Sequence, residues 1–419
     1  MLKNKDIRKK ILFTVMIITI FEIGVNIPVP GIDRSVLEQM FNGNGAFELF
    51  NLFTGGAFGN MTLFALGITP YITASIIFQL LAIAIPRLEA ISKESDGQKQ
   101  IATYTRYLTV FLGLIQATGM TYGIFRNAVL DNSLLTNISI ILLLTAGMSV
   151  LMWLGEQINE YGIGNGISII IFASIANRIP VDIRSIIDAY MQDTISLMTV
   201  ILIAAFALVI IGVVIYVNEG VRKIPVSYAK RVVGRKAYGG SATHLPIKVN
   251  AAGVIPIIFA MSLLQFPMVI SYMFPDSGYA KFIAKYLSTN GTPGAYIYMA
   301  LNFALILFFT YFYTSIVFKP KEIADNLANN SGTIPGIRPH KQTELFLGKV
   351  SNRLCLFSGV FLGLISSLPI LTSTFSTLQL TFGGTSVLIV VGVALDTMKQ
   401  INNKATLYNN YSFLKKGSK

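Results

Sequence analysis

The sequence predicts an all-α membrane protein with ten transmembrane helices. Of its 419 residues, 53% are hydrophobic and 13% are charged, a composition typical of membrane proteins. Charged residues are absent from long windows, and several of these exceed the ~20 residues that a helix needs to cross the bilayer. The charge-free windows are 49–86, 132–155, 194–218, 249–275, 286–318 and 354–395.

Ten apolar segments follow in order along the chain. The first begins after the basic residues of 1–10 and runs to Pro28 and Pro30 with no small-residue cleavage site, so we expect a first span rather than a cleaved signal. The predicted spans are 11–30, 63–86, 107–125, 138–155, 167–179, 196–217, 251–274, 295–318, 354–371 and 384–398.

The basic residues alternate with these spans in a regular way. When the N-terminus is placed inside, the inner segments carry 27 of the 33 Lys and Arg residues. This is the bias that the positive-inside rule describes, and it predicts that both termini are cytoplasmic. A net charge of +13 is therefore explained by topology, without nucleic acid as a ligand.

Ten spans divide into halves of five, 1–180 and 181–419, and because five is odd the second half enters the membrane in the opposite sense. Two halves that cross the membrane in opposite senses form an inverted repeat. The second half has two long basic inner loops, 218–250 and 319–353. Neither contains an apolar run that would form a separate core, so we interpret both as projecting loops that meet a partner outside the membrane.

Spans 167–179 and 384–398 are short, and helices of that length cover only ~20 Å of a ~30 Å core. Such segments usually line a cavity. Glycines 162, 164 and 166 precede the first of them, and glycines 383 and 384 precede the second. The first glycine cluster is not a phosphate loop, because it follows a long apolar run and no Walker motif occurs in the chain.

The outer segment of about 33–60 is semi-apolar and glycine-rich. It is too polar at Glu48 for a span and too apolar for a solvated loop. A re-entrant element that folds back into a cavity and an interfacial amphipathic helix explain this composition equally well.

Several long motifs in this order resemble the SecY family, the central subunit of the bacterial protein-translocation channel. They are IPVPGID (27–33), ALGITPYITASIIFQLL (65–81), MWLGEQI (152–158) with GIGNGISIIIF (162–172), SATHLPIKVNAAGVIP (241–256), ADNL (324–327) with PGIRP (335–339), and FGGTSVLIVVGV (382–393). The resemblance implies an hourglass-shaped, passive channel in the bacterial cytoplasmic membrane. Such a channel secretes unfolded polypeptides and releases membrane helices sideways into lipid.

The resemblance also implies a ring of aliphatic side chains at the waist of the channel. Independently of the family, a narrow apolar constriction expels water and ions, and flexible aliphatic side chains seal around a passing chain of any sequence. The expected ring residues are Ile68, Ile72, Ile167, Ile171, Ile258 and Ile389.

Further roles follow from the same resemblance. Residues 33–60 are expected to be a plug, and spans two and three are expected to face spans seven and eight across a lateral gate. Gln79 and Gln265 are the candidate polar residues of that gate, although a helix–helix hydrogen bond explains each equally well. Arg235, Lys236 and Arg338 are expected to dock the ribosome and the motor ATPase SecA. The small membrane subunits SecE and SecG, signal sequences, nascent polypeptides and lipid are the other expected partners.

Three features depart from the family pattern. One is the inner loop after span two, SDGQKQ (95–100), which is poorer in arginine than usual. Glu22 lies in the first span where family members commonly have arginine, and a carboxylate there is costly unless it is paired or faces a cavity. His340 follows PGIRP where glycine is typical.

Three other functional classes fit the sequence less well. A secondary transporter also uses inverted repeats, but it needs ionisable groups near the membrane midplane, and only Glu22 and Asp396 lie in or at the end of a span. A small-ion channel needs rings of carbonyls or charges. No nucleophile–base spacing, metal cluster or cofactor motif indicates an enzyme, and the single Cys355 excludes an intramolecular disulfide.

Overall fold

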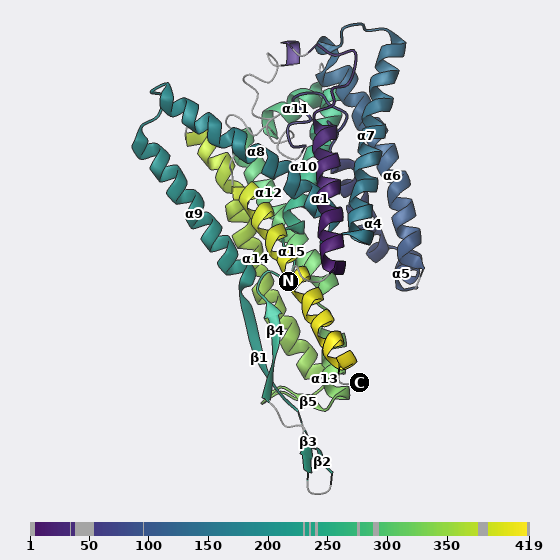
Figure 1. Cartoon of the computed structure of the whole chain (residues 1–419), viewed down its shortest axis with the longest axis vertical. Helices are drawn as coiled ribbons and strands as arrows, with labels where there is room; N and C mark the ends of the chain where they lie inside the picture. Colours follow the sequence, from purple (N-terminus) through teal and green to yellow (C-terminus); the bar gives the residue numbers. More distant parts are fainter. Residues whose placement is uncertain are drawn as a thin grey trace.

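The computed structural model describes residues 5–33, 35–37, 54–94, 96–228, 231–233, 236–238, 242–274, 277–287, 293–375 and 384–416. Within these ranges the chain forms a helical bundle with a β extension at one end (Figure 1), which we call the sheet end. The long helices are α1 (Lys5–Val25), α4 (Thr69–Ala84), α6 (Gly97–Gly119), α7 (Leu134–Tyr161), α8 (Gly166–Met191), α9 (Leu197–Glu219), α10 (Ile255–Met273), α12 (Gly294–Val317), α14 (Lys341–Phe375) and α15 (Gly384–Lys416).

Shorter elements join these helices. They are α5 (Pro86–Lys93), a π-helical turn (Met120–Ile124) that extends α6, a 3-10 turn (Arg126–Ala128), α11 (Gly278–Tyr286) and α13 (Pro320–Asn329). Each of the ten predicted spans overlaps one long helix, so the all-α membrane fold is confirmed. Seven helical stretches among the described residues are long and apolar enough to cross a membrane, and α4 and α10 are shorter apolar helices.

The prediction that two spans are too short for the bilayer is wrong. Helix α8 has 26 residues and α15 has 33. The charge-free windows end near Arg178 and Asp396, but a charged side chain does not interrupt the backbone hydrogen bonds of a helix. Both helices therefore continue past the point where their apolar sequence stops.

The glycine cluster before α8 forms a tight turn between α7 and α8. Asn165 caps α8, because its side-chain oxygen accepts the Ser168 N–H at 3.2 Å. A Cβ on Gly166 would overlap the carbonyl oxygen of Gly155 on α7. Glycine is needed at residue 166 because the two helices approach each other so closely here.

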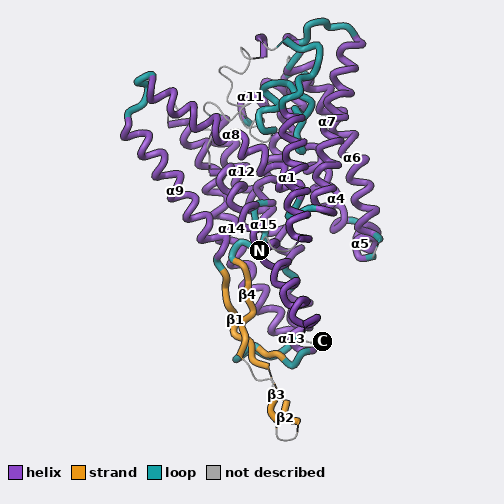
Figure 2. Tube along the Cα trace, in the orientation of Figure 1, coloured by secondary structure: helices purple, strands orange, loops and turns teal. Residues whose placement is uncertain are grey.

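The sheet end is built from the two basic loops together. Strand β1 (Val221–Tyr228) pairs antiparallel with β4 (Ala242–Lys248) and with β5 (Gly332–Thr333), so it is the central strand. Strands β2 (Arg231–Val233) and β3 (Lys236–Tyr238) pair in a second, smaller hairpin. Figure 2 shows β1, β4 and β5 beside one end of the helices, with β2 and β3 projecting beyond it.

Neither loop forms a core alone, as predicted, but the two loops share a core that was not predicted. Ile224 and Val226 are buried while the residues on either side of each are exposed, which is the period-two pattern of a strand with one covered face. They contact residues of the other loop and of α14 in a small core. Its buried members are Ile224, Val226, Ile247, Leu327, Ile334 and Leu347. The core was missed because neither loop alone holds an apolar run.

Candidate pore constriction

The six predicted ring residues come from four helices and lie in one apolar cluster. Ile68 and Ile72 are at the start of α4, Ile167 and Ile171 on α8, Ile258 on α10 and Ile389 on α15. Five of them are at most 6% exposed, and Ile167 is half-buried against the same cluster. We call these six residues the ring cluster.

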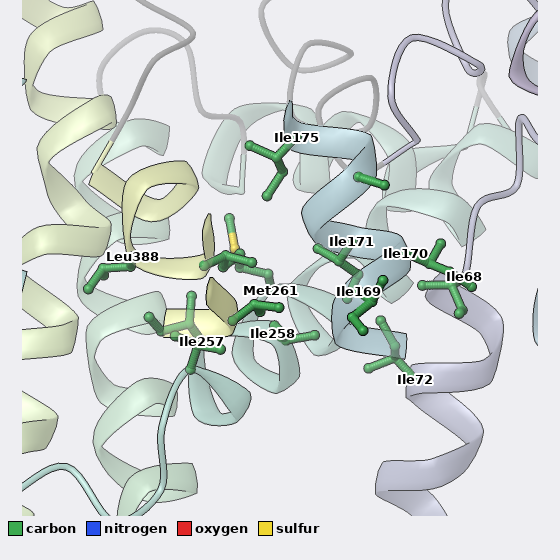
Figure 3. Packing of buried hydrophobic residues seen from close by; sticks show 14 of the residues in the cluster. Ile68, Ile72, Ile169, Ile170, Ile171, Ile175, Ile257, Ile258, Met261 and Leu388 are labelled. Atoms are coloured by element: carbon green, nitrogen blue, oxygen red, sulfur yellow. The ribbon is translucent and has the colours of Figure 1, made fainter. Parts of the chain in front are cut away.

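The close-up in Figure 3 shows how the cluster is arranged. Ile68 and Ile72 of α4 lie beside Ile170 and Ile169 of α8, and Ile258 of α10 lies between that pair of helices and Leu388 of α15. The helix starts place these side chains: Pro70 stands in the first turn of α4 and Pro256 in the first turn of α10. Each ring residue on these two helices is therefore within a turn of a fixed helix start.

Sequence reasoning missed several equally buried neighbours. Ile169 and Ile170 are 4% and 2% exposed, and Ile257 and Leu388 are fully buried. The unbroken run of isoleucines in GISIIIF could have indicated the burial of Ile169 and Ile170, because a helix that is apolar on all sides is buried on all sides. The aliphatic cluster is therefore a packed layer that extends beyond the six predicted ring residues.

A polar cavity of 350 Å³ adjoins the cluster on its sheet side. Val254 and Val393 belong both to the cluster and to the lining of this cavity. The remaining lining is rich in amides, hydroxyls and charges, among them Asn165, Ser168, Asn250, Asp396, Lys399 and Gln400. An apolar constriction thus meets a polar vestibule within about one helical turn.

Hydrogen bonds hold the wall of this vestibule together. The side-chain amide of Asn250 donates to Asn218 Oδ1 at 2.8 Å and to the Gly253 carbonyl at 3.2 Å, and its oxygen accepts the Ser358 hydroxyl at 2.9 Å. We call Asn218, Asn250, Gly253 and Ser358 the base network. It joins the end of α9, the turn before α10 and the middle of α14.

Helix α15 is tied to the same region by two polar contacts. Lys399 forms an ion pair with Glu219 of α9 at 2.8 Å. Gln400 accepts the backbone N–H of Gly164, just before α8, at 3.1 Å. The sheet-side ends of α8, α9 and α15 are therefore linked through polar groups.

The described part of the predicted plug lies against α8 on the other side of the cluster. Asn177 of α8 donates to the Gly55 carbonyl at 3.3 Å, and Ala57 is fully buried in the same apolar cluster as the ring residues. Phe58 packs edge-on against Phe125 with ring centroids 5.4 Å apart. Residues 34 and 38–53 of the predicted plug lie outside the described residues.

The two predicted gate glutamines are placed differently. Gln265 of α10 is 6% exposed and lines a 20 Å³ cavity between α10, α6 with its π-helical turn, and the segment 54–69 that leads into α4, together with the buried Gln116 of α6. Gln79 donates to Ser75 of its own helix at 3.0 Å and does not line this cavity. Gln116 was missed, although it is the single amide in the run LGLIQATG.

Two of the three predicted docking residues, Lys236 and Arg338, are described and lie at the sheet end. Arg338 is exposed in the turn before α14, where its carbonyl accepts the Thr343 hydroxyl at 2.9 Å. Lys236 begins β3, and Arg235 lies outside the described residues. Glu22 is half-buried on α1, and none of the ion pairs found among the described residues includes it.

A bundle of ten long helices, with a buried aliphatic cluster beside a polar cavity, is the architecture of a polytopic membrane protein. The SecY family profile matches residues 62–398. The chain is 43% identical over 438 residues to the "Protein translocase subunit SecY" of Streptomyces scabiei, across 99% of this chain and 98% of that one. It therefore belongs to the SecY family.

The fold is also that of solved channel structures. "The structure of a protein conducting channel" matches with a TM-score of 0.71 and 22% identity, across 97% of this chain and 94% of that one. "Sec61 in the Canine ribosome-channel complex from the endoplasmic reticulum" matches with a TM-score of 0.66 and 20% identity, with the same coverage.

Proposed function

We propose that this protein is a passive conduit for unfolded polypeptides in the bacterial cytoplasmic membrane. The observation that carries the proposal is the ring cluster, an aliphatic constriction that separates a polar vestibule from the segment 54–60. The 43% identical relative is named a translocase subunit, which supports the same function.

The seal works through the absence of polar groups. Water that entered the ring cluster would lose its hydrogen bonds, so the constriction stays dry and blocks ions. Aliphatic side chains offer no directional bond to satisfy, and they therefore close around a passing chain whatever its sequence. Segment 33–60 acts as a second barrier on the same path; its described residues 54–60 lie at the end away from the vestibule.

A lateral exit lies between α10 on one side and α4 with α6 on the other. These helices pack against one another, and the cavity between them presents Gln116 and Gln265. Amide side chains there weaken the apolar contact without a buried charge, which suits an interface that opens toward lipid. Gln79 lies farther along α4 and acts as a helix-stabilising polar residue.

The sheet end faces the cytoplasm, with both termini on the same side, in line with the positive-inside bias. Basic residues of its two loops, Arg235, Lys236 and Arg338, dock the ribosome or the motor ATPase SecA, and the energy for transport comes from these partners. A structural relative was solved in a ribosome–channel complex. SecE and SecG complete the membrane complex.

The two halves are an inverted pair. The boundary at residue 180 falls inside α8, which ends at Met191, so the division between the halves lies in the turn at 192–196. No catalytic step is assigned to the chain.

The test is the conductance of the purified channel in planar bilayers. The double variant Ile72→Ser, Ile171→Ser should leak ions at rest, because hydroxyls lower the cost of wetting the constriction. The leak should grow when residues 33–60 are also deleted. Ile140→Ser is the matched control, since Ile140 is equally buried but lies in a separate cluster.

Two results would count against the proposal. If the ring variant conducts no more than the control, with or without residues 33–60, the isoleucines are ordinary packing residues. If vesicles with the unchanged complex do not import a secretory precursor when a motor is supplied, the conduit function itself fails. The transporter alternative has no observation in its favour among the described residues.

A further inference from the structure

Helix α11 is an amphipathic helix at the end of the bundle opposite the sheet. It has nine residues, GYAKFIAKY, and connects the end of α10 to the start of α12. Ser277 caps it by accepting the Ala280 N–H at 3.1 Å. In Figure 1 it lies near the far ends of α10 and α12, away from β1 and β4.

One face of α11 is fixed to the bundle. Ile283 is 6% exposed and packs in a cluster with Leu264 and Met268 of α10 and Tyr298 of α12. The Tyr279 hydroxyl donates to the carbonyl of Pro267 at 3.1 Å. The helix is therefore held against α10 at two points, an apolar contact and a hydrogen bond.

The other face combines aromatic and cationic side chains. Phe282 is 55% exposed, and Lys281 and Lys285 are exposed one helical turn apart. Phe274 at the end of α10 and Tyr296 at the start of α12 add 59% and 45% exposed aromatic side chains at the same end of the bundle. None of the ion pairs found within the described residues involves either lysine.

The depth of α11 follows from the helix that precedes it. Helix α10 has 19 residues and rises about 28 Å at 1.5 Å per residue, close to the ~30 Å thickness of the hydrocarbon core. A helix that begins only a few residues after α10 ends therefore lies near the head groups. Aromatic side chains concentrate at that depth, and lysines there reach phosphate while their stems remain in an apolar setting.

We propose that α11 is a lipid-binding element: Lys281 and Lys285 bind the phosphate of anionic phospholipid head groups, and Phe282 inserts among the upper acyl chains. An anionic phospholipid fits this face best, because two exposed lysines beside exposed aromatic rings complement a ligand that is both negatively charged and amphipathic. These lipids belong to the outer leaflet, an assignment that rests on the proposed function, in which the sheet end faces the cytoplasm. The bond from Tyr279 to Pro267 connects the bound lipid to α10, the helix on one side of the proposed lateral exit.

The first test measures where residue 282 lies. Phe282→Trp is made in a Trp153→Phe background, so that one indole reports on α11 in the full-length protein in vesicles. We expect phosphatidylglycerol with brominated acyl chains to quench this indole and aqueous acrylamide to leave it largely unquenched. Quenching by acrylamide alone places residue 282 in water and overturns the proposal. If neither reagent quenches the indole, residue 282 is buried within the protein, and the proposal is again overturned.

The second test measures lipid selectivity as the ratio of phosphatidylglycerol to phosphatidylcholine retained by the purified protein. A lysine near an anionic surface contributes about 1 kcal/mol, so Lys281→Gln with Lys285→Gln should lower the ratio by roughly fivefold per lysine. Lys281→Arg with Lys285→Arg should keep the ratio. Lys321→Gln with Lys349→Gln, two exposed lysines at the sheet end, is the matched control and should also keep it.

Other outcomes separate this inference from the proposed function. An unchanged ratio in the Lys→Gln variant, or displacement of phosphatidylglycerol by an equal concentration of inorganic phosphate, overturns lipid binding at α11. Precursor import is measured on the same vesicles. If the protein imports the precursor but shows no selectivity for phosphatidylglycerol, only the lipid-binding inference is overturned. If the unchanged protein is selective for phosphatidylglycerol but does not import the precursor, only the conduit function is overturned.

Discussion

The ring cluster and the base network lie close together and are held by opposite kinds of contact. The ring cluster consists of aliphatic side chains, whose attraction depends on contact area and has no preferred direction. The base network consists of hydrogen bonds at 2.8–3.2 Å, each of which needs one partner in one position. The first kind of contact separates and closes again in many geometries. The second fixes a single geometry, so in the proposed channel the constriction that opens adjoins a region whose geometry is fixed.

The largest effect is expected from removing the centre of the base network. Asn250→Leu leaves the Ser358 hydroxyl, the Asn218 side-chain oxygen and the Gly253 carbonyl without this partner in a buried site. We expect a loss of about 3 kcal/mol in the free energy of unfolding, measured by thermal unfolding in detergent. Asn330→Leu is the control, because Asn330 is exposed. Equal melting temperatures for the two variants would show that the network is hydrated and replaceable.

The ring cluster should tolerate a change of shape at constant volume. Ile258→Leu keeps the apolar volume and is expected to cost less than about 1.5 kcal/mol, with no resting leak. Unfolding and bilayer conductance are measured on the same preparation. A large leak from this variant would contradict a seal built on contact area, and would indicate that the waist needs one defined packing.

The next effect is smaller and is an increase in stability, expected at the sheet end. His340 has a positive φ of 62°, a conformation that costs a non-glycine residue roughly 1 kcal/mol. His340→Gly should therefore stabilise the turn before α14 by about that amount, seen as slower proteolysis of this turn. Gln342→Gly, within α14, is the control. It should destabilise the start of this helix and speed its proteolysis, because glycine is unfavourable inside a helix. Faster cleavage in His340→Gly would mean that the contact of His340 with Asp325, 3.6 Å away, outweighs the strain.

The smallest effect is expected from the ion pair beside the base network. Lys399 and Glu219 are 34% and 46% exposed, so Lys399→Gln should cost only about 0.5 kcal/mol in the free energy of unfolding. Lys319→Gln breaks a more exposed pair with Glu322 of α13 and should cost less still. A loss from Lys399→Gln as large as that from Asn250→Leu would place this ion pair inside the network rather than beside it.

The sequence reveals most clearly the features that depend on local composition. Charge-free windows locate the spans because charge is excluded from lipid everywhere. Pro70 and Pro256 mark the helix starts that bring Ile68, Ile72 and Ile258 into the ring cluster. The ends of α8 and α15 could not be predicted in this way, since a helix continues after its apolar sequence stops.

Features that depend on distant pairs stayed hidden. Asn218, Asn250 and Ser358 meet only after α9, α10 and α14 have packed, and no local pattern marks them. Gln116 and Gln265 are far apart in the sequence and share one cavity. The alternation of apolar residues in β1 did signal a strand with one covered face, but its covering residues belong to the other loop.

Helix α15 is long enough to act mechanically. Its 33 residues rise about 50 Å, and it carries Ile389 of the constriction and, farther along, Lys399 with its attachment to α9. The two residues are separated by about 15 Å along the axis. If the rod pivots at Lys399, a tilt of about 5° displaces the Ile389 backbone by about 1.3 Å, which is close to the length of one carbon–carbon bond. In the channel that we propose, such a tilt would move Ile389 within the constriction by this distance.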